Sequence, residues 1–389
     1  MSQTSFLVVC VRLQYGIYMR KTFEYRVYPT SKQVRVLNQM LEECRWVFNQ
    51  TLALRKNAWE QEQKSISLYA TNAFLPKWKL ERPSLSVVYS QVLQDAQERV
   101  DLAFKSFFRR AKAGEKPGYP RFRGKGRYSS LTYPQFGFSL QDGTIMAAKI
   151  GELKTIIHRP LEGKIKTLTL RRHSTGKWYA CFSCEVELAP LPPSEKAVGI
   201  DVGLESFATF STGEKVANQR FFRKDEKSLA KAQSKLSKAE KGTPERARRR
   251  KAVSHIHDRI ANRRKDFAHK LSRKLVDEHG IIALEKLNGK RMLRNHCLAK
   301  SISDAAWFQL VQFVSYKAEY AGRSVALVDP RNTSKRCSRC GSLVNKGLSI
   351  RVHSCPHCGL VLDRDLNASI NILALGLESL GRTPRSPRL

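Results

Sequence analysis

The sequence predicts a multidomain α+β fold that includes a metal-binding segment close to its C-terminal end. Its 389 residues can form about two to four domains, and a hydrophobic fraction of 41% is enough to build their cores. Apolar residues alternate in some stretches, as in strands, and recur every three or four residues in others, as in helices. Two CxxC pairs, Cys337 with Cys340 and Cys355 with Cys358, are separated by fourteen residues.

Net charge is the most unusual property of the composition. Lys and Arg total 70 against 34 Asp and Glu, which gives a formal net charge of +36 and a pI near 10.1. An excess of this size, spread along the chain, favours nucleic acid as a partner over a solvated basic surface or a ribosomal-type protein. Nine cysteines without a paired framework favour the reducing cytoplasm, and no apolar run reaches transmembrane length.

The N-terminal half is expected to contain one strand, two long helices and then a sheet. Residues 1–18 are expected to be an upstream extension or to precede an alternative start, and the alternating segment 19–29 is expected to be a strand. The sequence TSKQ at 30–33 predicts a capping box that begins the first helix. The second helix is expected over 84–112 because its apolar residues follow a helical period. Short alternating segments over 128–188 predict a β-barrel or a small sheet.

A basic segment with interleaved aromatic residues, KPGYPRFRGKGR at 116–127, lies before this sheet. Such a segment can clamp phosphates and stack on bases, whereas the alternative is a solvated linker. Within the sheet, CxxC spacing recurs at Cys181 and Cys184, but strand alternation would put these sulfurs on opposite faces, so we interpret both as ordinary thiols. The candidate nucleic-acid contacts of the basic segment are Arg121, Arg123, Lys125 and Arg127.

The C-terminal half alternates strands and helices. A hairpin is expected over 196–210, with its first strand ending at Asp201. A strongly basic helical region over 224–278 combines an apolar stripe with a charged face for a phosphate backbone, and this face includes Arg263 and Arg264. The remaining elements are a strand at 280–285, a helix at 305–320, a strand at 323–329 and a helix from Asn367.

Acidic residues stand at the boundaries of three of these elements. Asp201 and Glu285 each end an apolar strand, and Asp363 and Asp365 precede the last helix. Each has a structural alternative, as a turn residue, a strand-end salt bridge or a helix N-cap. Together they match the acidic triad of an RNase H-like nuclease, whose carboxylates hold two Mg²⁺ about 4 Å apart. Spacing alone does not decide between Asp363 and Asp365.

The four cysteines near the C-terminal end are expected to bind one structural Zn²⁺. Each CxxC turn presents two thiolates to one point, and the glycine after each pair, Gly341 or Gly359, permits the tight turn. His353 and His357 are alternative ligands because they lie close in the sequence. The regular pairs favour the all-thiolate set of Cys337, Cys340, Cys355 and Cys358.

Beyond these single features, a series of motifs over residues 20–377 resembles the TnpB family, the RNA-guided endonucleases of small bacterial insertion sequences. The family is related to compact type V CRISPR effectors. The resemblance identifies Asp365 as the third catalytic acid beside Asp201 and Glu285, with Asp363 as a neighbour. The matching segments are YRVYP at 25–29, PGYPRF at 117–122, GIDVG at 199–203, DP at 329–330 with TS at 333–334, the CxxC pairs, and DRDLNA at 363–368.

The fold implied by the resemblance has two parts. A wedge β-barrel with an inserted helical recognition domain is followed by an RNase H-like (RuvC) α/β nuclease core, which a zinc ribbon interrupts. The extension at 1–18 has no counterpart in the family. The expected segments are the extension 1–18, the first barrel strand 19–31, the recognition domain 32–116, the barrel remainder 117–191, the nuclease core 192–332, the zinc ribbon 333–360, the final helix 361–380 and the tail 381–389.

The activity implied by the resemblance is RNA-guided cleavage of DNA through two-metal-ion phosphodiester hydrolysis. A guide RNA from the same mobile element would pair with double-stranded target DNA, and the protein would read a short adjacent duplex motif. The implied cofactors are two catalytic Mg²⁺, one structural Zn²⁺ and the guide RNA, with the chain a monomer or weak dimer. The alternatives are a nuclease-inactive RNA-guided repressor, a transposition-associated DNA-joining enzyme and a structural zinc-ribbon RNA binder.

The adjacent motif is expected to be read by the N-terminal half, through the helix at 84–112. Its polar face is predicted to carry Tyr89, Gln91, Gln94 and Gln97, and glutamine amides can bond adenine edges in a major groove. Gln91 and Gln94 share a face because they are three residues apart. The alternative is a solvated polar face that covers a helix bundle, in which case the barrel segment 128–138 is the next candidate.

Overall fold

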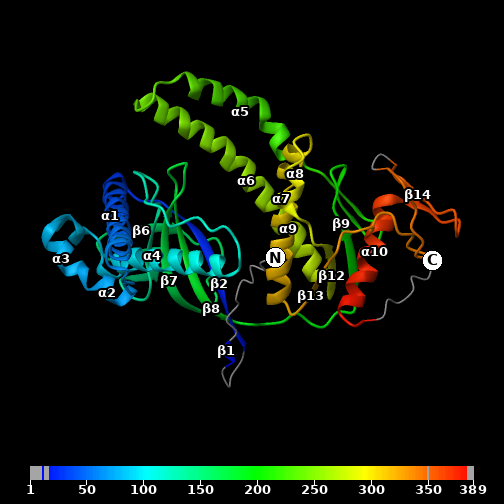
Figure 1. The fold of residues 1–389 in the computed structure, drawn as a ribbon, viewed down its shortest axis with the longest axis horizontal. Helices are drawn as coiled ribbons and strands as arrows, with labels where there is room; N and C mark the ends of the chain where they lie inside the picture. The colour runs from blue at the N-terminus through cyan, green and yellow to red at the C-terminus, as the bar shows by residue number, and fades with distance from the viewer. Residues whose placement is uncertain (1–10, 13–16, 348–349, 383–389) are drawn as a thin grey trace. The chain divides into compact units, whose positions relative to one another are not determined.

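The computed structural model describes residues 11–12, 17–347 and 350–382 of the chain (Figure 1). The chain divides into two units, Met1–Glu187 and Leu188–Leu389, and each has its own hydrophobic core. Within the described ranges, no helix is both long enough and apolar enough to span a membrane.

The N-terminal unit is built on an eight-stranded antiparallel sheet with the order β3-β7-β8-β2-β6-β5-β4, and β1 pairs with β2. The long strand β2 pairs with β8 from Tyr18 to Val27. The sheet curls into a nearly closed barrel, because the ring of Tyr133 on edge strand β3 contacts that of Phe138 on edge strand β4, with 6.5 Å between centroids. The strands are β1 (Val11–Arg12), β2 (Ile17–Val27), β3 (Ser130–Tyr133), β4 (Phe138–Gln141), β5 (Thr144–Ala147), β6 (Gly151–Ile156), β7 (Lys164–Arg172) and β8 (Trp178–Glu187).

A group of helices is inserted into this sheet between β2 and β3. The predicted capping box is confirmed: Thr30 accepts from the backbone N–H of Gln33, whose side chain accepts from the N–H of Thr30. The predicted start of the second long helix was wrong, because buried Val88 is extended and separates a 3₁₀ turn from the helix. The segments are α1 (Ser31–Glu62), α2 (Leu68–Asn72), α3 (Phe74–Glu81), the 3₁₀ turn η1 (Pro83–Val87) and α4 (Ser90–Lys112).

The C-terminal unit contains a five-stranded sheet of order β11-β10-β9-β12-β13, in which β9, β12 and β13 are parallel and β10 is antiparallel to its neighbours. One face packs against α6 (Pro244–Glu278) and α9 (Trp307–Tyr320), and the other packs against α10 (Arg364–Ser379) (Figure 1). This is the RNase H-like arrangement expected from the sequence. The strands are β9 (Ala197–Asp201), β10 (Ser206–Phe210), β11 (Lys215–Ala217), β12 (Ile281–Glu285) and β13 (Ser324–Val328).

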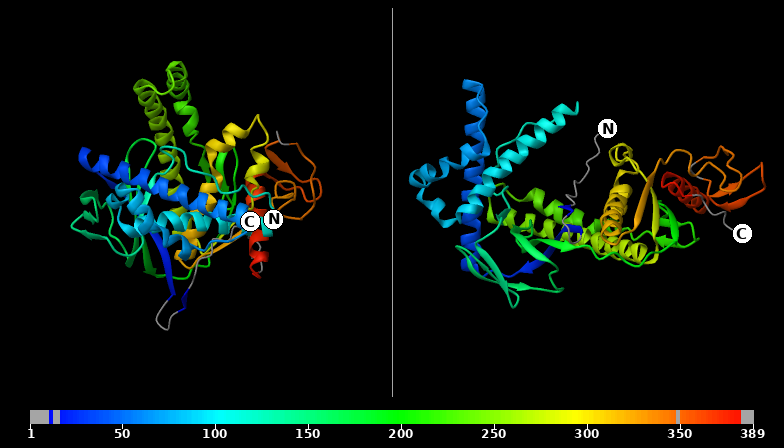
Figure 2. Two further views of the ribbon diagram at one scale, coloured as in Figure 1. Left: turned by 60° about the vertical axis from the view of Figure 1, so that its left-hand side comes forward. Right: turned by 90° about the horizontal axis from the view of Figure 1, so that it is seen from below.

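The basic region predicted as helical forms two antiparallel helices, α5 (Phe221–Lys238) and α6, which we call the α5–α6 arm (Figures 1 and 2). The short helices α7 (Gly289–Met292) and α8 (Ala299–Ala305) follow β12, and the cysteine-containing segment adds the antiparallel pair β14 (Val352–Ser354) and β15 (Val361–Asp363). The last helix begins at Arg364 rather than at Asn367 as predicted, because the Asp363 side chain caps it.

Candidate active site and metal centre

Asp201 and Glu285 end two neighbouring parallel strands. β9 and β12 pair in register up to Ile200 opposite Leu284, so the acids that follow lie side by side at the carboxyl edge of the sheet. The apolar runs before them are buried between two layers of helices, and each acid is the first half-buried position after its run. The carboxyl edge of a parallel sheet is where functional groups gather in many α/β proteins.

Helix α10 brings the third acid to the same edge. It crosses β9 in very close contact, since a Cβ on Gly199 would lie 2.1 Å from the carbonyl oxygen of Ser369 and 2.6 Å from the backbone nitrogen of Leu373. Only a residue without a side chain permits this approach. Asp365, in the first turn of α10, is consequently close enough to Asp201 for the two charges to interact. The structure therefore brings together all three acids singled out in the sequence.

Burial and mutual repulsion act on Asp201. Burial raises the pKa of Asp201 well above its ordinary value, and the carboxylates of Glu285 and Asp365 raise it further. The Arg364 guanidinium and the backbone N–H of Val202 act in the opposite direction but do not cancel the increase. Without a cation, the centre therefore disfavours full ionisation of its acids.

Glu285 is held by a neighbour that the sequence analysis did not identify. The Thr333 hydroxyl lies 2.7 Å from Oε1 of Glu285 and donates to it. Burial raises the pKa of Glu285; the Thr333 hydrogen bond lowers it, and the charge of Asp329 raises it. Asp329, directly after β13, is thus a fourth acid near this edge, and its position after a buried strand was a signal that could have identified it. Its Oδ1 accepts from the N–H of Arg331, as a turn residue does.

Asp363 and Asp365 differ in what their side chains do. Asp363 Oδ1 accepts from the N–H groups of Asp365 and Leu366, both at 3.0 Å, and its Oδ2 lies 2.8 Å from Nζ of Lys215. Burial raises the pKa of Asp363, but Lys215 and these N–H groups outweigh it and lower the pKa overall. Both oxygens of Asp363 thus have structural partners, which supports Asp365 as the acid of the centre.

The four cysteines converge on one point. Among the described residues, they form the one group of three or more potential metal ligands that lie together, and their sulfur atoms are all within 4.8 Å of one another. The sulfurs of Cys337 and Cys358, and of Cys340 and Cys355, are 3.6 Å apart. Four Zn–S bonds of about 2.3 Å in a tetrahedron would separate sulfurs by about 3.8 Å. The thiolate set therefore fits Zn²⁺.

The two histidines beside the cluster are placed differently from the cysteines. His353 is fully buried on β14, and its Nδ1 lies 2.5 Å from Nζ of Lys346. Burial and the Lys346 charge both lower the pKa of His353. His357 is exposed. Neither belongs to the converging group, which favours the all-cysteine set over the histidine alternative.

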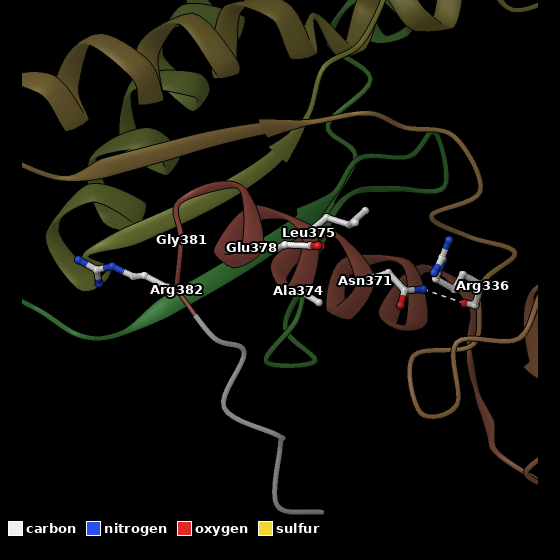
Figure 3. Close-up of a pocket in the computed structure, with 7 residues that line it drawn as sticks. All are labelled: Arg336, Asn371, Ala374, Leu375, Glu378, Gly381 and Arg382. Atoms are coloured by element: carbon white, nitrogen blue, oxygen red, sulfur yellow. Dashed lines mark hydrogen bonds between the residues drawn. The ribbon is translucent and has the colours of Figure 1, made fainter.

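Two buried asparagines of α10 attach the first cysteine turn to the helix. The Asn367 amide donates to the carbonyl of Arg336 at 2.8 Å and accepts from the N–H of Ser338 at 2.9 Å. The Asn371 amide donates to the carbonyl of Thr333 at 2.8 Å and to that of Arg336 at 2.7 Å; Figure 3 shows the bond to Arg336. The cavity drawn there, about 500 Å³, is lined in part by Asn371 and Arg336 and by none of the three acids. Two asparagines four residues apart on an apolar helix were a signal that the sequence analysis did not use.

The basic segment before β3 is ordered against α1. The Asn49 side chain bonds both the N–H and the carbonyl of Arg123, at 2.8 and 3.0 Å, and Glu42 accepts from the N–H of Gly126. The Arg123 guanidinium also lies over the ring of Phe48. The backbone of this segment is therefore held by hydrogen bonds while its basic side chains are exposed, which is consistent with a phosphate clamp. The clamp stays a prediction for Arg121, Arg123, Lys125 and Arg127.

Arg263 and Arg264 both have acidic partners at the base of the α5–α6 arm. Arg263 pairs with buried Asp225 at 3.0 Å, and Arg264 forms two hydrogen bonds to buried Asp304. Asp304 also accepts from the N–H of Phe222 in the first turn of α5, so it holds α5, α6 and α8 together. The phosphate contacts predicted for these two arginines remain untested, and the structure gives both a role in holding the arm.

The candidate motif readers on α4 are unequally exposed. The Tyr89 ring stacks on Tyr133 of the barrel, with centroids 6.0 Å apart, and Gln91 accepts weakly from the N–H of Phe136. Gln97 is not on the polar face as predicted: it is fully buried, and its amide donates to the carbonyl of Thr71 at 2.7 Å. Gln94 is exposed, so the reading role stays a prediction for Tyr89, Gln91 and Gln94.

Comparison with known sequences identifies the family. Residues 181–296 match a family described as "Probable transposase", residues 307–372 match a Cas12f1-like TNB domain, and residues 19–64 match a helix-turn-helix domain, although the structure has β2 and the single helix α1 there. A Streptomyces pristinaespiralis protein named as an RNA-guided DNA endonuclease is 39% identical over 369 residues, which are 93% of this chain and 90% of that one. The similarly named InsQ of Escherichia coli K12 is 30% identical over 377 residues, 92% of each chain.

A solved structure shares the fold. The Cas12f1 protein in a complex with sgRNA and target DNA matches with a TM-score of 0.57 and 15% identity, over 91% of this chain and 98% of that one. The chain thus has a fold like that of Cas12f1, with an RNase H-like core and a four-cysteine segment within the part that matches the Cas12f1-like TNB domain. On the sequence matches, the chain belongs to the TnpB family of insertion-sequence proteins.

Proposed function

We propose that this chain is an RNA-guided DNA endonuclease that cleaves by metal-dependent phosphodiester hydrolysis. The observation that carries the proposal is the meeting of Asp201, Glu285 and Asp365 at the carboxyl edge of the RNase H-like sheet. Relatives that match over at least 90% of both chains are named as RNA-guided DNA endonucleases. A protein that only bound DNA would have no need for three acids in one repulsive group, so their presence favours cleavage over the repressor alternative.

The acidic centre fits Mg²⁺ by the chemistry of its donors. Carboxylate oxygens are the ligands that Mg²⁺ prefers, and the raised pKa values of the buried Asp201 and Glu285 support a centre in which a cation would favour the ionised acids. Two ions are what the resemblance to RNase H-like nucleases implies. Asp201, Glu285 and Asp365 would hold them. When bound, the ions supply an activated water and charge stabilisation for the leaving 3′ oxygen.

The chain's own residues prepare this centre. Helix α10 places Asp365 through the close contact at Gly199, and the Asp363 cap fixes the first turn of the helix that carries it. Partial burial of the acids limits the access of competing water and strengthens their interaction with cations. The four cysteines, which leave no open position on a tetrahedral Zn²⁺, would serve a structural purpose.

The outer half of the α5–α6 arm is the surface we propose for guide RNA. Near the base of the arm, cations pair with acids such as Asp225, Asp304 and Glu214. Further out, the described structure shows exposed cations that form no ion pair. This surplus of positive charge suits a phosphate backbone and adds to the exposed side chains of the segment 116–127. The unpaired cations are Lys227, Lys231, Lys235, Lys238, Lys241, Arg248, Arg250 and Lys251.

The function is tested by cleavage with the natural guide. The chain, copurified with RNA from its own locus, is incubated with a library of plasmids and Mg²⁺. We expect double-strand cuts at guide-matched sites beside one short motif, and none with EDTA or a scrambled guide. Sequence-specific binding without cuts would instead indicate a repressor, joined products would indicate a DNA-joining enzyme, and binding of RNA alone would indicate a structural role.

The RNA surface is tested by the salt dependence of binding. The slope of log K against log salt is negative, and each lost phosphate contact lowers its magnitude by about 0.7 to 0.9. Lys231→Ala with Lys235→Ala removes two unpaired charges, whereas Lys270→Ala with Arg273→Ala removes two charges that pair with Asp266 and Asp277. We expect a smaller slope only for the first pair. Equal slopes for the two double variants would exclude the outer arm as the RNA surface.

A further inference from the structure

We propose that Thr333 is a positioning residue that fixes the carboxylate of Glu285, and that the attachment of the zinc-binding segment to α10 holds Thr333 in place. The inference rests on the proposed function, because it assigns a role within the same acidic centre. In the sequence, Thr333 belongs to the TS motif at 333–334 and lies four residues before Cys337, but neither feature assigns it a role.

The hydrogen bond to Glu285 has a defined direction. The Thr333 hydroxyl has one proton and lies 2.7 Å from Glu285 Oε1 and 3.1 Å from the carbonyl oxygen of Pro330. Hydrogen bonds to a charged acceptor are shorter and stronger than those to a neutral one, so the proton points to the carboxylate. Thr333 is 5% exposed, so water competes little for this bond.

The backbone at Thr333 is fixed from the opposite side. The Asn371 amide donates to the carbonyl oxygen of Thr333 at 2.8 Å. It also donates to that of Arg336 at 2.7 Å, as Figure 3 shows, and the two bonds join α10 to the first cysteine turn. Asn371 lies on the helix that carries Asp365 in its first turn. One helix thus places Asp365 directly and Glu285 through Asn371 and Thr333.

The consequence for the acidic centre is orientation. A carboxylate rotates about its last bond, so Glu285 could present either oxygen to a cation. A donor fixed on Oε1 stops this rotation and leaves the lone pairs of Oε2 available. Residues that hold a metal ligand in this way typically change metal affinity or activity by about 10- to 100-fold when replaced. Threonine suits the position because its branched side chain has few rotamers.

The test compares two replacements that keep the buried position filled. Thr333→Val keeps the shape and removes the hydroxyl, and Thr333→Ser keeps the hydroxyl. Thr51→Val is the matched control, because Thr51 is also fully buried but donates to the carbonyl of Val47 in α1. Binding of Mn²⁺ alone to the protein is measured by electron paramagnetic resonance, and cleavage is measured against Mg²⁺ concentration. Zinc content and melting temperature are recorded for each variant.

Thr333→Val is expected to weaken Mn²⁺ binding and to raise the Mg²⁺ concentration for half-maximal cleavage, each by about 10- to 100-fold. Thr333→Ser should recover most of both, and Thr51→Val should change neither. The inference is overturned if Thr333→Val behaves as the wild type, or if Thr333→Val and Thr333→Ser are impaired equally with loss of zinc or of melting temperature. If Thr333→Val weakened Mn²⁺ binding as expected but the wild-type protein cut no DNA, the proposed function would be contradicted and this inference would stand.

Discussion

The four-cysteine cluster and the acidic centre belong to one unit but are built in opposite ways. The cluster lies within residues 337–358, and local hydrogen bonds close its turns, from the N–H of Gly341 to the carbonyl of Cys337 and from Gly359 to Cys355. The acidic centre joins residues 201, 285 and 365 from two strands and a helix, and it depends on the register of β9 with β12 and on the seat of α10. The cysteine cluster is thus formed largely within one short segment, whereas the acidic centre forms only when the sheet and α10 are assembled.

The two centres are also expected to affect the folding stability of the C-terminal unit in opposite directions. Four thiolates around Zn²⁺ leave no open ligand position, so metal binding there contributes directly to folding. Burial and the charges of Glu285 and Asp365 raise the pKa of Asp201, so the ionised form of Asp201 opposes folding when no cation is present. The cysteine cluster is therefore expected to stabilise the unit when its metal binds, and the acidic centre is expected to destabilise the unit when it holds no cation.

The largest expected effect comes from the acids. Asp201→Ala, Glu285→Ala and Asp365→Ala should each lower cleavage by about three orders of magnitude or more, because groups that act as one unit are lost together. Affinity for guide RNA and target DNA should stay close to wild type, since no phosphate contact is removed. Cleavage and filter-binding assays on the same preparations check both statements, and a single variant that cuts at the wild-type rate would remove its residue from the centre.

The zinc cluster should affect cleavage indirectly. Cys355→Ser should eliminate the one Zn²⁺ expected per chain and lower cleavage by about 100-fold, because a displacement near 1 Å at a reactive group has an effect of that size. The melting of the N-terminal unit should not change. Elemental analysis and X-ray absorption of the wild type should show one zinc with four sulfur ligands; a Zn–N bond or zinc-free active protein would contradict the thiolate set.

A smaller effect is expected from the neighbour of the third acid. Asp363→Ala removes the cap of α10 and the Lys215 pair, and loss of an N-cap typically destabilises by about 1 kcal/mol. Cleavage should therefore decrease far less than in Asp365→Ala. Chemical denaturation and cleavage rates measure the two quantities. If Asp363→Ala were inactive and Asp365→Ala active, the assignment of the third acid would have to be reversed.

The smallest effect concerns the empty acidic centre. The raised pKa of Asp201 means that the folded chain binds its proton more tightly than the unfolded chain, so this group loses stabilising protonation as pH rises above about 4. Asp201→Asn, which stays neutral, should thus melt a few degrees higher than wild type in EDTA at pH 8, and the gap should narrow toward pH 4. Calorimetry over this range tests the sign. A variant that melts lower throughout would show that repulsion is not the dominant effect.

The sequence was sufficient where a feature is local. The cysteine cluster could be predicted because each CxxC turn is a short segment, and Asp201 and Glu285 could be found because each ends an apolar strand. Spacing alone did not separate Asp363 from Asp365, since the capping bonds that distinguish them depend on where α10 begins. The family resemblance supplied that choice.

Other features depend on contacts between residues far apart in the sequence, which neither the charge of a residue nor its place in a helical or strand pattern predicts. Arg263 and Arg264 look like free cations in the sequence, but their acidic partners lie 38 and 40 residues away. Gln97 was predicted to face solvent because it is polar, whereas it is buried inside the helical group and its NH₂ donates to the carbonyl of Thr71. Thr333 could not be recognised because its partner, Glu285, lies 48 residues earlier.

Gly199 has a genetic consequence that its chemistry would not suggest. It has no side chain with which to bind a ligand, yet a Cβ at this position would lie 2.1 Å from the carbonyl oxygen of Ser369 in α10 and would shift the helix that carries Asp365. A selection for alleles that still find their target but no longer damage DNA should therefore recover changes at Gly199 along with changes at the acids. The position of Asp365 relative to Asp201 and Glu285 thus depends on a residue that has no side chain.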